Sequence, residues 1–231
     1  MMEEMYATTT ASKSACPSPD DYMKSFEGAD NIIVVTITGT LSGSYNSAEI
    51  AKKIYLEEHP NANIHVIDSL SAGGEVDLLI RKLNHLVAEG LDFDQVLDAI
   101  TAYRAKTKLL FVLAKVDNLV KNGRLSKLVG TVVGLLNIRM VGEASKTGTL
   151  ELLQKARGQK KAIKAAFDEL LKAGYAGGHI TIAHRNNEKF IEQFSELVRE
   201  KFAQASIEVL PTSGLCSFYA EEGGLLMGYE I

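Results

Sequence analysis

The fold class is decided by the stretch Asn31-Ile32-Ile33-Val34-Val35-Thr36-Ile37 and by the turn that follows it. A nearly continuous β-branched run of this kind is typical of a strand whose two faces are both covered by other elements. Beyond the turn, apolar residues recur at helical spacing at Ala48, Ala51, Ile54 and Tyr55. A buried strand, a turn and an amphipathic helix together predict an α/β unit.

The turn between that strand and that helix is rich in glycine and hydroxyl groups and spans residues 39–48. Gly39 and Gly43 allow close approach of the backbone, and the first N–H groups of the helix lack partners within it. Thr38 and Ser42 add hydroxyl donors. The turn is therefore a candidate site for a carboxylate or phosphate. The alternative is a glycine turn with a serine N-cap and no ligand.

Strands and helices alternate along most of the remaining chain. Apolar runs predict strands, and apolar stripes of helical period predict helices. The predicted strands are 63–67, 109–113, 179–183 and 206–210, and the predicted helices lie after 75, near 93–100, over 163–171 and over 190–202. This order predicts two α/β domains, residues 1–106 and 107–231, each with a mostly parallel or mixed sheet flanked by helices.

Composition narrows the possible functions. The chain has 231 residues, is 46% hydrophobic and carries a formal net charge of −4, which argues against a general nucleic-acid binder. Cys16 and Cys216 lie too far apart in sequence to indicate a zinc site or a disulfide framework. No apolar run approaches the roughly 20 residues that span a bilayer, and the N-terminus does not resemble a signal peptide. These features predict a cytoplasmic protein.

Familiar catalytic motifs are missing from the sequence. The histidines show no metal-ligand spacing, and no GxSxG elbow, Walker A sequence or GxGxxG fingerprint follows a strand. Asp68-Ser69-Leu70-Ser71 comes directly after the second strand. Ligands collect at the carboxyl edge of a parallel sheet, so this segment is either part of a ligand site or a helix-capping turn before Glu75.

Two basic stretches and one apolar stretch are further candidate functional segments. Residues 121–127 and 155–161 are predicted to be basic turns, either for an acidic partner or as solvated surface. Between them, residues 129–138 are unusually apolar and are expected to be core or to line a channel.

The motifs together resemble the DegV family of bacterial fatty-acid-binding proteins, which includes the lipid-carrying subunit of fatty acid kinase. The matching segments are 16–20, 41–48, 66–69, 122–127, 135–138 and 155–158. The resemblance implies two α/β domains with the ligand at their interface. It also implies that hydroxyl-rich segments hold the carboxylate while the tail enters an apolar tunnel of the second domain.

The resemblance also indicates which residues of this chain stand at the family's site positions. Its head-group positions fall on Ser14, Thr38, Gly39, Ser42 and Tyr219. Tyr219 stands where family members commonly carry a histidine, and Gly39 stands where they carry a serine. Two arginines in basic family motifs, Arg124 and Arg157, are expected to contact a partner protein. The family's opening strand has no counterpart before Met5.

The expected function is therefore to bind a long-chain fatty acid and to present its carboxylate to a separate ATP-dependent fatty acid kinase subunit. The resemblance implies no catalytic residues, no metal and no cofactor other than the bound fatty acid. Peripheral contact with a membrane is expected during lipid exchange. Two alternatives stay open at this point. One is an enzyme or enzyme subunit for a small phosphorylated or carboxylated metabolite, and the other is a degenerate regulatory member of the family.

Overall fold

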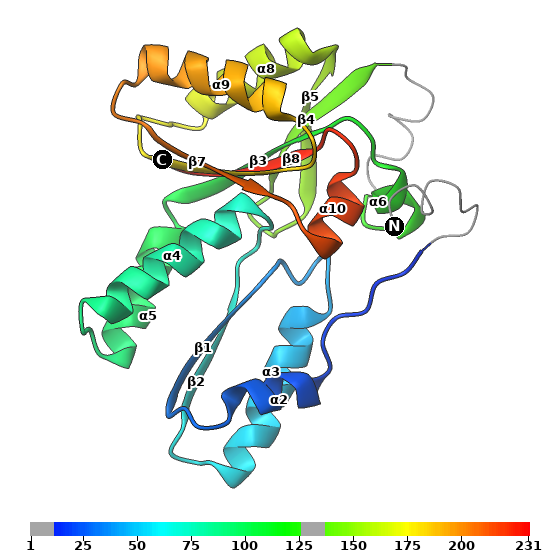
Figure 1. Cartoon of the computed structure of the whole chain (residues 1–231). Coiled ribbons are helices and arrows are strands. Elements are labelled where there is room, and N and C mark those ends of the chain that lie inside the picture. Colours follow the sequence, from blue (N-terminus) through cyan, green and yellow to red (C-terminus); the bar gives the residue numbers. More distant parts are fainter. Residues whose placement is uncertain (1–11, 126–136) are drawn as a thin grey trace.

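The computed structural model describes residues 12–125 and 137–231 (Figure 1). Its helices are α2 (Pro19–Phe26), α3 (Ser44–Glu58), α4 (Gly74–Ala88), α5 (Phe93–Arg104), α6 (Asp117–Lys121), α8 (Gln159–Lys172), α9 (Glu188–Lys201) and α10 (Gly214–Ala220). Its strands are β1 (Asn31–Thr36), β2 (Asn63–Asp68), β3 (Thr107–Leu113), β4 (Ile138–Ala144), β5 (Leu150–Arg157), β6 (His179–His184), β7 (Ser206–Pro211) and β8 (Leu225–Glu230).

These strands form two sheets within the described ranges. β1 and β2 pair in parallel, with α2 and α3 on one side and α4 and α5 on the other (Figure 1). The larger sheet has the order β5-β4-β3-β8-β6-β7 and is mixed, because β6 and β7 pair in parallel while the other neighbours are antiparallel. The predicted α/β class with flanking helices is confirmed, and the larger sheet takes the mixed form.

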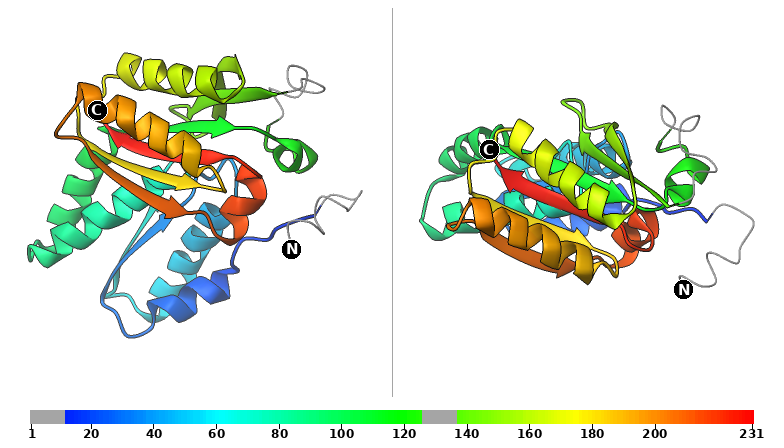
Figure 2. Two further views of the ribbon diagram at one scale, coloured as in Figure 1. Left: turned by 45° about the horizontal axis from the view of Figure 1, so that its top comes forward. Right: turned by 90° about the horizontal axis from the view of Figure 1, so that it is seen from above.

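The main core lies between the larger sheet and the helices α8 and α9, which run side by side over one of its faces (Figure 2). The apolar stripes of both helices face this core. Phe190 and Phe194 of α9, Leu170 of α8 and Tyr229 of β8 are almost completely buried there. The helical periodicity read from the sequence therefore identified the correct buried faces.

Helix α4 joins the smaller sheet to the larger one. It packs against β1 and also against β6 and β8. A Cβ atom at Gly74 would lie 2.1 Å from the carbonyl oxygen of Thr181, and one at Gly228 would lie 2.3 Å from the backbone nitrogen of Glu75. The first turn of α4 therefore touches the larger sheet backbone to backbone. Because α4 precedes residue 107 and packs on strands that follow it, the division at 106/107 stays a prediction.

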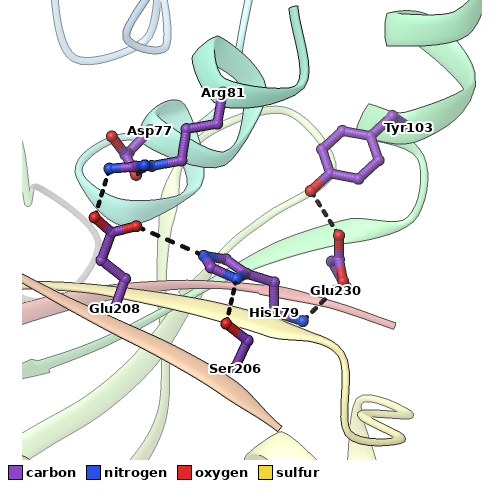
Figure 3. A network of polar contacts seen from close by, with 7 residues as sticks. All are labelled: Asp77, Arg81, Tyr103, His179, Ser206, Glu208 and Glu230. Atoms are coloured by element: carbon purple, nitrogen blue, oxygen red, sulfur yellow. Dashed lines mark hydrogen bonds and ion pairs between the residues drawn. The ribbon is translucent and has the colours of Figure 1, made fainter. Parts of the chain in front are cut away.

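A polar network supports the same junction at the surface (Figure 3). Arg81 of α4 pairs with Asp77 at 2.6 Å and with Glu208 of β7 at 2.7 Å. The Tyr103 hydroxyl of α5 donates to Glu230 Oε1 at 2.8 Å, and the backbone N–H of His179 donates to Glu230 Oε2 at 2.8 Å. The two exposed ion pairs of Arg81 contribute roughly 0–1 kcal/mol each, so they orient α4 more than they stabilise the fold.

Several sequence predictions need correction. Residues 155–161 are not a turn, because 155–157 end β5 and α8 begins directly after Gly158. β4 and β5 were missed because polar and charged side chains interrupt their apolar residues, and in β5 half-buried and exposed positions alternate. β8 was missed as well, together with α2, α6 and α10. The predicted apolar stretch 129–138 lies outside the described residues as far as position 136.

Candidate functional site

An apolar cavity of about 100 Å³ lies where the β1–α3 turn, the larger sheet and α10 meet. Ile37 and Leu41 come from the β1–α3 connection, Phe111 and Leu113 from β3, and Ala220 from α10. Further apolar walls come from α6, β5 and the start of β8. Figure 1 shows α6 and α10 near the end of the larger sheet, next to this connection. The cavity therefore lies between the two sheets.

Polar groups gather at one place on the cavity wall. Arg124 and Tyr219 both line the cavity, and the Arg124 guanidinium carbon lies 4.3 Å from the centre of the Tyr219 ring. The Ser14 and Tyr219 hydroxyls lie 3.0 Å apart, and Arg124 Nη1 donates to Ser14 Oγ at 3.4 Å. Burial lowers the pKa of the Arg124 guanidinium, and no carboxylate in the described part of the chain offsets this shift. A partly buried positive charge thus stands beside two hydroxyls.

Ser14 reaches this cluster because its segment lies against the start of α3. The Ser47 hydroxyl donates to the carbonyl oxygen of Pro17 at 2.7 Å. A Cβ atom at Gly43 would lie 3.1 Å from Cys16 Sγ, so the two segments approach each other closely. Residues 14–17 are thereby held between the β1–α3 turn and α10.

The β1–α3 turn itself already holds a carboxylate of the protein. The backbone N–H of Gly39 donates to both carboxylate oxygens of Asp68 at 3.2 Å, and Leu70 N–H donates to Asp68 Oδ1 at 3.0 Å. A second anion at Gly39 would meet the negative charge of Asp68. The alternative of a helix cap at 68–71 is wrong, because the N-cap of α4 is Gly73 and makes no side-chain hydrogen bond.

The hydroxyls of this turn bond mainly among themselves. Thr38 is buried, with its Oγ1 3.1 Å from Thr40 Oγ1, and Thr40 donates to the carbonyl oxygen of Gly148 at 2.6 Å. Ser42 Oγ lies 2.9 Å from Ser44 Oγ and accepts from Ser44 N–H at 3.2 Å. The N-cap of α3 is Gly43, so the alternative of a serine cap is wrong. Ser42 follows the cavity residue Leu41, whereas Thr38 is packed under the β4–β5 loop.

The structure thus brings together Ser14, Tyr219 and Arg124 from the predicted set. Arg124 lines the cavity, and Arg157 is exposed at the end of β5. The expected contact of both arginines with a partner protein stays a prediction. Sequence reasoning missed α10, which also contributes Leu215 and Cys216 to the cavity. Its seven residues are too short for helical periodicity to be recognised.

Across 12–125 and 137–231, no helix combines the length and the apolar character needed to cross a membrane. In the same part of the chain, no group of three or more histidine, cysteine, aspartate or glutamate side chains is arranged to hold a metal ion.

An apolar cavity whose wall carries one guanidinium and two hydroxyls suits a ligand with an apolar body and an anionic end. The fold and the site therefore define an α/β protein that binds amphiphilic anions. The family model described as "uncharacterised protein, DegV family" matches residues 1–229. The chain belongs to the DegV family, which confirms the resemblance seen in the sequence.

Similar proteins include a DegV domain-containing protein of Streptococcus gordonii, 77% identical over all of this chain and 82% of its own length. Among solved structures, the fatty acid kinase (Fak) B3 protein of Streptococcus pneumoniae, loaded with linoleic acid, is 77% identical with a TM-score of 0.97 and covers 100% of this chain and 82% of that one. A DegV family protein of Eubacterium eligens loaded with heptadecanoic acid is 39% identical, with a TM-score of 0.95 and coverage of 100% and 83%.

Proposed function

We propose that this protein binds a long-chain fatty acid, with the tail in the apolar cavity and the carboxylate beside Arg124, Ser14 and Tyr219. The observation that carries the proposal is the partly buried Arg124 guanidinium in an otherwise apolar wall, which forms no ion pair with a carboxylate of residues 12–125 or 137–231. A fatty acid carboxylate would supply the missing negative charge. The fatty acids in the similar pneumococcal and Eubacterium structures support the same ligand class.

The energetics of the tail favour a long chain. About fifteen methylenes at ~0.8 kcal/mol each give roughly 12 kcal/mol of gross transfer free energy before ordering costs. The cavity of about 100 Å³ is smaller than the roughly 300–1,000 Å³ of typical ligand pockets. Entry of a long tail therefore requires lining side chains to move apart. The head group chiefly fixes the orientation of the ligand.

The first prediction concerns the bound lipid. Protein purified from bacteria is expected to carry a near-stoichiometric amount of long-chain fatty acid, measured by mass spectrometry of an organic extract. In competition against a labelled acid, the methyl ester of the same acid should bind about 10- to 100-fold more weakly, because it is uncharged beside Arg124. A lipid-free extract combined with no saturable binding of the labelled acid would contradict the proposal.

We further propose that the protein does not itself transfer phosphate but offers the bound carboxylate to a separate ATP-dependent kinase. The similarity to the pneumococcal Fak B3 protein supports this role. Ser42, Thr38 and Gly39 are proposed to shape the mouth of the site, since they lie in the turn that contributes Leu41 to the cavity wall. Contact with a membrane surface during lipid exchange stays a prediction.

The second prediction tests the kinase partner through Arg157, which is exposed at the end of β5. Arg157→Glu is expected to slow acyl phosphate formation by an added fatty acid kinase about tenfold or more, because reversing a rim charge slows encounter with the partner. Fatty acid affinity should stay unchanged. The matched control is Arg199→Glu on the exposed side of α9, which should alter neither quantity. Equal loss of fatty acid affinity and of acyl phosphate formation would instead show that Arg157 supports the folded structure and not the kinase contact.

A further inference from the structure

A second arginine, Arg139 of β4, is partly buried and forms no ion pair with a described acidic residue. Its Nε and Nη1 atoms are buried and have no hydrogen-bond partner. Its Nη2 makes one long contact, 3.5 Å, with Gln159 Oε1. Burial lowers the pKa of the Arg139 guanidinium, and no acidic group contributes to the shift. Arg124 at the cavity is similar, because burial lowers the pKa of its guanidinium and no described acidic group offsets the shift.

Arg139 lies on the opposite face of the larger sheet from the cavity. Its neighbour Met140 packs in one cluster with Phe111 and Leu113, which line the cavity, whereas Val141 packs in the core under α8 and α9. Because side chains alternate along a strand, Arg139 shares the α8 face with Val141. A ligand at Arg139 would therefore occupy a site separate from that of the fatty acid.

Further hydrogen-bond donors surround the guanidinium. Gln159 Nε2 is also buried without a partner. Gln159 is the first residue of α8, whose N-cap Gly158 makes no side-chain hydrogen bond and whose first turn contains no acidic residue. A Cβ atom at Gly223 would lie 3.4 Å from Arg139 Nη1, so the α10–β8 turn closes one side of the group. Every group that this cluster leaves unpaired is a donor.

Buried polar groups without partners are rare in native proteins, and a buried charge without a counter-charge is costly. A phosphate oxyanion would supply acceptor oxygens for these donors. We propose that Arg139 and Gln159, beside the first turn of α8, bind a phosphate group. Three or more acceptor oxygens suit this number of separate donors, and helix N-termini favour phosphate. The phosphate can belong to inorganic phosphate or to a nucleotide. The proposal does not depend on the fatty acid site.

The test compares thermal unfolding of the lipid-loaded protein in sodium phosphate and in sodium chloride at equal ionic strength and pH. At a phosphate concentration ten times the Kd, Tm should rise by about 3–6 °C. ADP forms the second arm, and a rise with ADP alone would assign a nucleotide as the ligand. Broadening of the phosphate signal in ³¹P NMR gives an independent measurement on the unmodified protein. Absence of both a Tm rise with either ligand and line broadening would overturn the proposal.

Variants separate a phosphate site from a structural role. Arg139→Met should abolish the phosphate-dependent rise while leaving Tm in chloride equal or higher, because it removes an unpaired buried charge. Gln159→Leu should reduce the phosphate-dependent rise in Tm. If Arg139→Met does not fold, this second variant tests whether phosphate binds here. Lys164→Met, an exposed control on α8, should leave the rise unchanged. An undiminished phosphate effect in the Arg139 and Gln159 variants would contradict the assignment. Fatty acid binding is expected to persist in every variant, so failure here is distinguishable from failure of the lipid proposal.

Discussion

Gly74→Ala is expected to lower the free energy of unfolding by about 4 kcal/mol or more, which is exceptional for the addition of one methyl group. The new Cβ atom would lie 2.1 Å from the Thr181 carbonyl oxygen and 2.7 Å from the Gly228 backbone nitrogen. Both are backbone atoms of the larger sheet, so no side chain can rotate away. Alanine in a helix is otherwise favoured over glycine by up to about 1 kcal/mol, so the loss would be purely steric.

Chemical denaturation monitored by circular dichroism measures this effect. The matched control is Gly90→Ala, since Gly90 has a φ of +79° but nothing lies within 4 Å of its would-be Cβ. That variant should lose only about 1–2 kcal/mol, the cost of a left-handed conformation. Gly228→Ala should resemble Gly74→Ala, because its Cβ would lie 2.3 Å from the Glu75 backbone nitrogen. Equal losses at Gly74 and Gly90 would show that α4 is not packed on the sheet this closely.

Arg124→Met should weaken fatty acid binding by about 10- to 100-fold, since a hydrogen bond to a charged group contributes roughly 1.5–3 kcal/mol. Methionine keeps an unbranched apolar side chain against the Tyr219 ring, so the cavity wall should persist. The loss should be confined to ligands with a carboxylate. A fatty alcohol of equal length is expected to bind the variant and the unmodified protein with similar affinity, because the alcohol carries no charge for Arg124 to pair with.

Titration of labelled acid and alcohol into each protein gives the two affinities. Arg199→Met, at an exposed position of α9, is the control for loss of one positive charge and should change neither affinity. Ser42→Ala is expected to have a smaller effect on the acid than Arg124→Met, because Ser42 Oγ is engaged with Ser44 at 2.9 Å. Unchanged acid affinity in the Arg124 variant would place the carboxylate elsewhere in the site.

Sequence reasoning identified the elements that are marked by a continuous β-branched run or by an apolar stripe of helical period. The run at 31–37 gave a strand that ends at Thr36, and the stripes at 163–171 and 190–202 lie within or next to α8 and α9. It failed for β4, β5 and β8, where glycine or charged residues interrupt the apolar positions. Periodicity reports only which side of an element is buried. It does not reveal which strands pair, so the mixed strand order of the larger sheet could not be predicted from the sequence.

By itself, the sequence determined the α/β class, the helix faces that enter the core and the motifs that mark the family. Tertiary structure alone decided the site. Ser14 and Tyr219, 205 residues apart, share a hydrogen bond only because residues 14–17 follow the start of α3 toward α10. The same packing brings Arg124 to the cavity wall and leaves two side-chain nitrogens of Arg139 buried without a hydrogen-bond partner. The physical reason is that periodicity arises from local geometry, whereas charge burial depends on which distant segments close over a side chain.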